Sequence, residues 1–171
     1  MKGEVMKVAL IFYSFSGNTQ KVFEYLKEIL LSKGCSVEFL QLKPENEPKN
    51  FFKQGFSAFT KKKPKLAGEV FYDLKDFDYI ILGTPLWAFT LSPALRSYLE
   101  KAKNLENKRV SFLFTYGSGA GLNKAIRELK SILEEKSAQV ESFASLEGKK
   151  VKERSYLEEK LKNFCACSSS G

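Results

Sequence analysis

The stretch Val8-Ala-Leu-Ile-Phe-Tyr13, followed at once by Ser14-Phe-Ser-Gly-Asn-Thr19, decides the fold of this chain. The first six residues are all apolar or aromatic, as expected of a strand that is buried on both faces of a parallel sheet. From Thr19 onward the apolar residues follow a helical period, with Val22 and Leu26 on one face. The chain therefore opens with a buried strand, a polar loop and a helix.

Apolar strand patterns and helical patterns alternate along the rest of the chain. Further strands are expected around residues 37–42, 79–82, 110–114 and 138–146, and further helices around residues 92–102, 122–133 and 156–164. Ser92 is a good N-cap, and Pro93 suits the first position of a helix. This alternation predicts an α/β fold with a doubly wound, five-stranded parallel sheet and helices on both faces. Such sheets bind ligands beyond the carboxyl ends of their strands.

Composition favours one soluble globular domain over residues 1–164, with a flexible tail over residues 165–171. The chain has 171 residues, of which 43% are hydrophobic, and it contains three cysteines. No apolar run approaches the ~20 residues of a membrane-spanning helix, and no secretory signal is visible. These features predict a cytoplasmic protein, in which Cys165 and Cys167 are incidental.

Residues 43–75 interrupt the alternation and are expected to form a variable basic insertion between the second and third strands. Phe52, Phe56 and Phe59 have helical spacing, which predicts one short helix followed by a lysine-rich loop. The net charge of +8 arises partly from lysines between residues 49 and 65. Two interpretations stay open for them: a solvated loop, or a docking patch for an acidic redox partner protein. No specific nucleic-acid partner is expected.

The loop Ser14–Thr19 has the composition of a phosphate site. It combines three hydroxyl side chains with Gly17, and its amides open into the N-terminus of a helix. Backbone N–H groups in such a loop point at an anion, and the helix dipole favours negative charge. Because the GxxxxGK[ST] pattern is absent, this is not a Walker loop.

The loop resembles the [ST]-x-[ST]-G-x-T phosphate signature of the flavodoxin family. The resemblance continues in Asp78-Tyr-Ile-Ile-Leu-Gly-Thr-Pro-Leu-Trp87 and in Thr115-Tyr-Gly-Ser-Gly119, and it runs from about residue 7 to residue 160. It implies a short-chain flavodoxin-like fold with strand order 2-1-3-4-5 and FMN as the cofactor. It also implies that the first loop binds the FMN phosphate and that the other two line the flavin ring, with Trp87 and Tyr116 on its two faces. The implied FMN-binding residues are Ser14, Ser16, Gly17, Asn18, Thr19, Thr84, Pro85, Leu86, Trp87, Ala88, Thr115, Tyr116, Gly117, Ser118 and Gly119.

One departure from the family concerns the second loop. No glycine lies between Thr84 and Leu91, and Phe89 stands where many relatives have one. Members that favour one-electron chemistry often flip a peptide beside the flavin at that glycine. A flip here would place a non-glycine residue at positive φ, which is unfavourable. We therefore expect one-electron chemistry to be less favoured here.

Histidine is absent from the chain, which argues against hydrolases that need a histidine base and against a zinc site. A phosphorelay receiver needs an acidic pair where Tyr13 and Ser14 stand. Two functions remain. The first is a flavodoxin-like electron-transfer protein that serves protein partners, and the alternative is an FMN-dependent NAD(P)H:quinone-type reductase with a small-molecule acceptor. No side chain is identified as a catalytic acid or base, and no metal ligand is expected.

Overall fold

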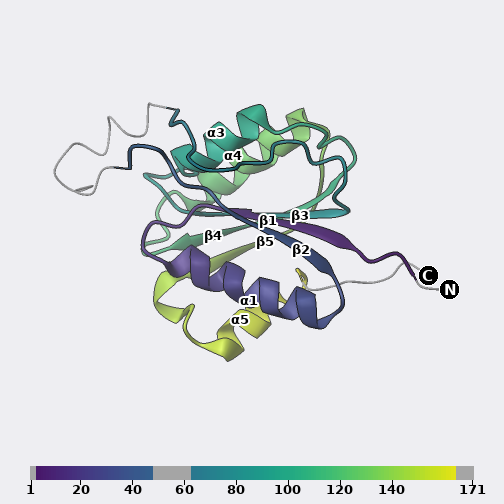
Figure 1. The fold of residues 1–171 in the computed structure, drawn as a ribbon. Helices are drawn as coiled ribbons and strands as arrows, with labels where there is room; N and C mark the ends of the chain where they lie inside the picture. Colours follow the sequence, from purple (N-terminus) through teal and green to yellow (C-terminus); the bar gives the residue numbers. More distant parts are fainter. Residues whose placement is uncertain (1–2, 48–62, 165–171) are drawn as a thin grey trace.

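The computed structural model describes residues 3–47 and 63–164, in which five parallel strands form a single sheet (Figure 1). The strand order is β2-β1-β3-β4-β5, so the predicted fold class is confirmed. The strands are β1 (Lys7–Phe12), β2 (Ser36–Gln41), β3 (Tyr79–Pro85), β4 (Arg109–Tyr116) and β5 (Gln139–Glu147). The helices are α1 (Asn18–Ser32), α3 (Pro93–Lys101), α4 (Leu122–Glu135), α5 (Arg154–Leu161) and the short 3-10 helix η1 (Gly148–Lys150).

Helices cover both faces of the sheet. Figure 1 shows α3 and α4 on one face and α1 and α5 on the other. Because successive side chains of a strand point to opposite faces, β1 contributes Ala9 and Ile11 to one core and Leu10 and Phe12 to the other. All four side chains are fully buried. This double burial explains why the sequence of β1 reads as a continuous apolar run.

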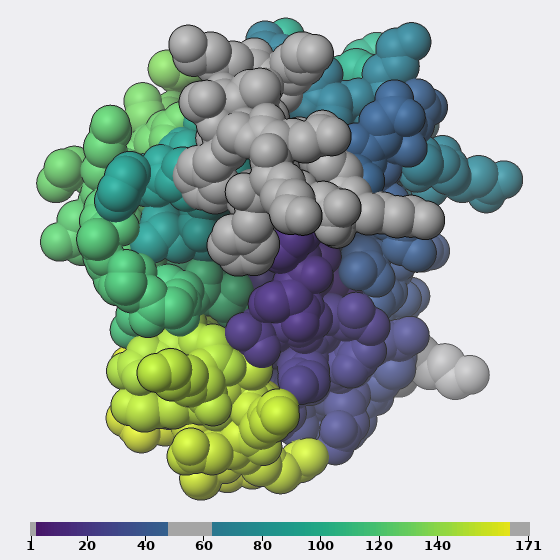
Figure 2. All heavy atoms as spheres, turned by 90° about the vertical axis from the view of Figure 1, so that its left-hand side faces the viewer, coloured from purple at the N-terminus to yellow at the C-terminus, as the bar shows by residue number. Residues whose placement is uncertain are grey.

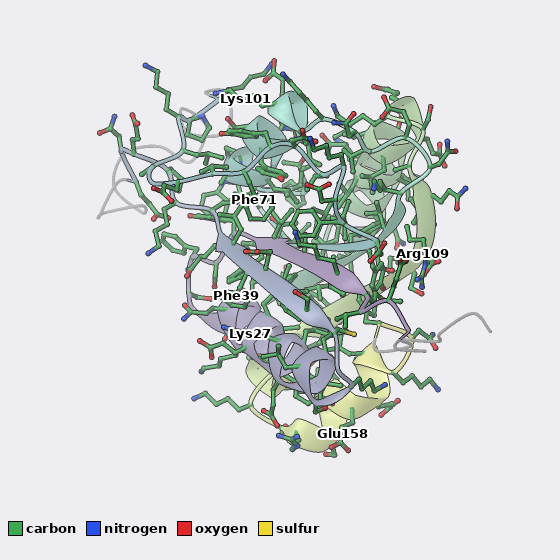
Figure 3. The ribbon with its side chains drawn as sticks, turned by 45° about the vertical axis from the view of Figure 1, so that its right-hand side comes forward. Lys27, Phe39, Phe71, Lys101, Arg109 and Glu158 are labelled. Carbon is green, nitrogen blue, oxygen red and sulfur yellow. The ribbon has the colours of Figure 1, made fainter. Side chains whose placement is uncertain are left out.

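The two outer strands are only partly covered. Along β5 exposed and half-buried residues alternate up to Ala144, which confirms the prediction that this strand lies at the sheet edge. Its Phe143 is 47% exposed and lies under the ammonium group of Lys130. On β2, Lys27 of α1 covers the ring of Phe39 at 5.0 Å (Figure 3). Lysine side chains on the neighbouring helices thus cover the aromatic rings of both edge strands.

Some predicted boundaries shift by a few residues. Strand β3 continues three residues beyond the predicted end at Leu82, because Thr84 and Pro85 still pair with β4. The N-cap prediction for α3 is confirmed, since Ser92 Oγ accepts a hydrogen bond of 3.3 Å from Leu95 N and Pro93 opens the helix. The extension of β3 places the start of the second loop beside β4.

The two ends of the insertion that follows β2 lie side by side. Residues 43–45 and 65–67 run antiparallel, with hydrogen bonds from Ala67 N to Lys43 O of 2.7 Å and from Glu45 N to Lys65 O of 2.9 Å. Ser97 of α3 donates a hydrogen bond of 2.7 Å to Pro64 O. We call residues 43–45 and 65–67 the clasp. The predicted helix over Phe52, Phe56 and Phe59 lies outside the described residues, as does the tail over residues 165–171.

Candidate functional site

The loops after β1, β3 and β4 meet at the carboxyl edge of the sheet, which faces the viewer in Figure 2. Residues 13–18 lie near its centre, beside the segment that begins η1. A Cβ on Gly148 would lie 2.5 Å from Asn18 Nδ2, so the start of η1 packs directly on the first loop. The fold therefore brings together the three loops that the sequence predicts to carry the site.

The first loop ends at Gly17, the N-cap of α1, which has φ 90°. An L-residue rarely adopts this conformation, so glycine is the residue that lets the chain turn directly into the helix. Among the described residues, no atom would lie within 4 Å of a Cβ on Gly17, so none of them covers the outer side of this turn. The first turn of α1 has no acidic residue, Ser16 is exposed, and Ser14 Oγ accepts a hydrogen bond of 3.1 Å from Gln20 N. A helix N-terminus with no acidic side chain in its first turn and with hydroxyls beside it fits a phosphate group.

Thr115 connects all three loops. Its hydroxyl oxygen lies 2.8 Å from that of Thr19 in the first helical turn, and both residues are buried. Its carbonyl accepts a hydrogen bond of 2.8 Å from the amide of Leu86 in the second loop. Both threonines were predicted to contact FMN directly; in this structure their side chains bond to each other beneath the surface.

We expect Thr115→Val to lower the free energy of unfolding by about 1–2 kcal/mol, because it leaves the buried Thr19 hydroxyl without its partner. Urea unfolding followed by circular dichroism measures this change. The double variant T19V/T115V removes both hydroxyls and should recover most of the lost stability. If the double variant loses as much free energy of unfolding as the two single variants together, the hydroxyl pair is not the cause.

The second loop contains a two-residue turn, residues 87–90. Trp87 N donates to Thr90 O at 2.8 Å, and Thr90 N donates to Trp87 O at 3.0 Å. The central residues Ala88 and Phe89 have φ values of 45° and 68°, the sign that a type I′ turn requires at both positions. Positive φ without glycine is locally unfavourable, yet this loop has it at two successive residues without any peptide flip. The two main-chain hydrogen bonds hold both residues there in the absence of glycine.

Side chains from α3 and α4 fasten this turn. The hydroxyl of Thr90 donates to the carboxylate of Glu128 and accepts a hydrogen bond of 2.7 Å from Arg96. Arg96 and Glu128 themselves form an ion pair of 2.5 Å. On its other side the turn packs on the start of α4, where a Cβ on Gly121 would lie 2.5 Å from Phe89 Cβ. Sequence reasoning missed Arg96 and Glu128 because their pairing depends on how two helices lie side by side.

The other predicted ring-lining residues differ in exposure. Trp87 is 4% exposed, with ring-centroid distances of 5.8 Å to Tyr13 and 5.5 Å to Phe15. Thr84 is fully buried, and its hydroxyl accepts a hydrogen bond of 3.0 Å from Ser92 N. The half-buried residues are Pro85, Leu86, Ala88 and Tyr116, and the exposed ones are Gly117, Ser118 and Gly119. The exposed aromatic residues on these loops, Phe15 and Phe89, were not among the predicted site residues.

Tyr13 connects the end of β1 to the insertion. Its side chain is buried, and its hydroxyl donates a hydrogen bond to the carboxylate of Glu47. Burial first, and then the hydrogen bond and negative charge of Glu47, raise the pKa of Tyr13 far above its usual value. Tyr13 is therefore a neutral hydrogen-bond donor at any physiological pH.

Comparison with known families identifies the family to which this chain belongs. Residues 6–148 match the family described as NADPH-dependent FMN reductase, so the protein belongs to this family of flavodoxin-like FMN-binding proteins. This membership confirms FMN as the predicted cofactor. A search of curated proteins found no match. In the described part of the chain, no helix is both long and apolar enough to cross a bilayer.

Solved structures share the fold at low sequence identity. Oxidised flavodoxin 2 from Bacillus cereus has a TM-score of 0.66 and 18% identity, covering 94% of this chain and 95% of its own. A flavoprotein in complex with FMN from Lactobacillus acidophilus NCFM has a TM-score of 0.62 and 18% identity, covering 88% and 99%. An azoreductase from Bacillus anthracis str. Sterne has a TM-score of 0.61 and 15% identity, covering 92% and 98%. These neighbours thus include both flavodoxins and reductases.

Proposed function

We propose that this protein is an FMN-dependent oxidoreductase that takes a hydride from NAD(P)H and reduces a small acceptor such as a quinone. The family, described by an NADPH-dependent reductase activity, supports this choice over a one-electron carrier. FMN, when bound, accepts two electrons as a hydride and passes them on. The protein supplies the position and electrostatics of the site, and no side chain is required as acid or base.

The proposed cofactor site follows from the open helix N-terminus and the loops around it. Ser14, Ser16 and Gly17, with the first amides of α1, would hold the phosphate, since this turn has no acidic residue. Pro85, Leu86, Trp87 and Ala88 of the second loop and residues 116–119 would line the flavin ring. Thr19 and Thr115 would act beneath this surface as positioning residues, because their hydroxyls bond to each other.

The 87–90 turn is the observation that carries the two-electron choice. Flipping the central peptide of a type I′ turn converts it to type II′, which needs glycine at the first central position. Here that position is Ala88, whose Cβ disfavours the required backbone conformation. The hydrogen bonds of Thr90 to Arg96 and Glu128 hold the turn further. One-electron chemistry that depends on such a flip is therefore disfavoured. The sequence led us to expect this because Phe89 replaces a glycine, whereas in the structure the obstacle is the Cβ of Ala88.

The test is NADPH oxidation by the FMN-loaded protein with a quinone as acceptor and no other protein present. We expect steady turnover, and photoreduction in the absence of quinone should convert the oxidised visible spectrum to the fully reduced one without an intermediate spectrum. A carrier would show no NADPH oxidation alone and a marked one-electron stage on photoreduction, and that pair of results would refute the proposal.

We expect Ala88→Gly to permit the flip and to make a one-electron stage visible during photoreduction. Phe89→Gly places glycine at the second central position, which type II′ does not require, and should leave the photoreduction spectra as in the wild type. The same spectra for A88G and the wild type would mean that the turn does not control the choice between one and two electrons.

A further inference from the structure

Phe89 is an exposed aromatic residue at the tip of the 87–90 turn. The residue is 57% exposed, although it lies at the carboxyl edge among the candidate site loops. The large apolar side chains exposed in the described part of the chain are Val5, Phe15, Leu31, Phe89 and Phe143. Of these, Phe15 and Phe89 belong to loops of the candidate site, so the site has two exposed rings on different loops.

The backbone conformation of Phe89 is energetically unfavourable, and several contacts hold it in place. A non-glycine residue at positive φ costs about 1–2 kcal/mol, and Ala88 adds a second such residue. The backbone nevertheless stays there, because main-chain hydrogen bonds, the Thr90–Arg96–Glu128 network and the contact with Gly121 fix the turn. Packing of Phe89 on Gly121 repays only part of this cost, since the residue is 57% exposed. A strained backbone that presents an apolar ring to solvent points to a ligand.

We infer that Phe89 stacks against the electron acceptor and that this acceptor is a planar conjugated molecule of the quinone class. This inference rests on the proposed function. The overall step consumes NAD(P)H, one proton and the quinone, and it yields NAD(P)⁺ and the hydroquinone, so two electrons and two protons reach the acceptor. A flat ring on a rigid turn suits stacking with another flat ring. A protein partner would need about 800 Å² of surface on each side, far more than one side chain offers.

The decisive variant is Phe89→Ala, which removes the ring but keeps a Cβ residue at the same backbone conformation. We expect the Kd of 2-methyl-1,4-naphthoquinone for the oxidised, FMN-loaded protein to rise about tenfold, measured by isothermal titration calorimetry without NADPH. The kcat/KM for this quinone should fall by a similar factor, whereas ferricyanide, which needs no stacking surface, should be reduced at the wild-type rate. Phe89→Tyr keeps a ring and should restore quinone binding.

Phe143→Ala is the matched control, because Phe143 has a similar exposure, 47%, but lies on the edge strand β5. It should leave both acceptors unchanged. The inference would be overturned if F89A lost the same factor in kcat/KM for quinone and for ferricyanide, or if it lost FMN. Either result would mean that Phe89 supports cofactor binding or the turn. Unchanged quinone binding would also overturn it. Failure of the wild type to oxidise NADPH would refute the proposed function alone, since the binding measurement needs no turnover.

Discussion

Ser16→Asp should weaken FMN binding by about 100-fold while leaving the apoprotein as stable as the wild type or slightly more stable. The exposed Ser16 lies one residue before the N-cap of α1, where the structure has no acidic side chain. A carboxylate about 4 Å from the FMN phosphate costs several kcal/mol even at an effective dielectric constant of about 20, before screening. The same carboxylate interacts favourably with the helix dipole, by about 0.5 kcal/mol. Flavin fluorescence titration and urea unfolding measure the two effects.

Two controls separate the phosphate from other causes. Ser155→Asp adds a carboxylate to the exposed first turn of α5, so it tests the helix dipole without touching the site. It should not change FMN affinity. Riboflavin lacks the phosphate, and its affinity for S16D should differ little from its affinity for the wild type. If S16D lost as much affinity for riboflavin as for FMN, the phosphate would not bind at this loop.

Gly83→Ala should lower the free energy of unfolding by about 3 kcal/mol, a large effect for one added methyl group. Gly83 lies in β3, and a Cβ there would come within 2.1 Å of the Phe23 ring of α1. That ring is fully buried and stacks on Phe12 with a centroid distance of 4.5 Å, so it has little room to move. Helix α1 would have to shift away from the sheet. Urea or thermal unfolding of the apoprotein measures the loss.

A second substitution tests this explanation. In the double variant G83A/F23L the smaller side chain makes room for the new methyl group, so the loss should be smaller than the sum of the two single changes. Gly117→Ala is the control, because a Cβ on Gly117 would meet no atom of the described residues within 4 Å. Its free energy of unfolding should lie within about 0.5 kcal/mol of the wild type. Simple additivity of G83A and F23L would show that Phe23 is not the obstacle.

The fold could be predicted because its signals are local and repeated. Each central strand is buried on both faces and reads as an apolar run, and the start of α3 is marked by Ser92 and Pro93. The loop proposed for the phosphate was identified for the same reason, since its hydroxyls and Gly17 lie within six residues of one another, from Ser14 to Thr19. These features depend on neighbours a few residues away.

The parts that could not be predicted depend on contacts between distant residues. Thr19 and Thr115 are 96 positions apart, and only the sheet order brings their hydroxyls together. The 87–90 turn contradicts a local rule, because the surrounding hydrogen bonds hold Ala88 and Phe89 at positive φ without glycine. Thr90, Arg96 and Glu128 form no sequence motif at all. Tertiary contacts here decide the conformation that local preference would disfavour.

The clasp has a consequence for how this domain tolerates change. Its hydrogen bonds hold residues 43–45 and 65–67 side by side, so the chain between them begins and ends at neighbouring points of the domain. For a flexible loop with fixed ends, each doubling of length costs only about 0.6 kcal/mol of closure entropy. We therefore expect the domain to tolerate peptides of different lengths grafted between residues 47 and 63. Because Glu47 bonds to Tyr13 at the end of β1, a graft that begins after residue 47 also retains the contact with the site.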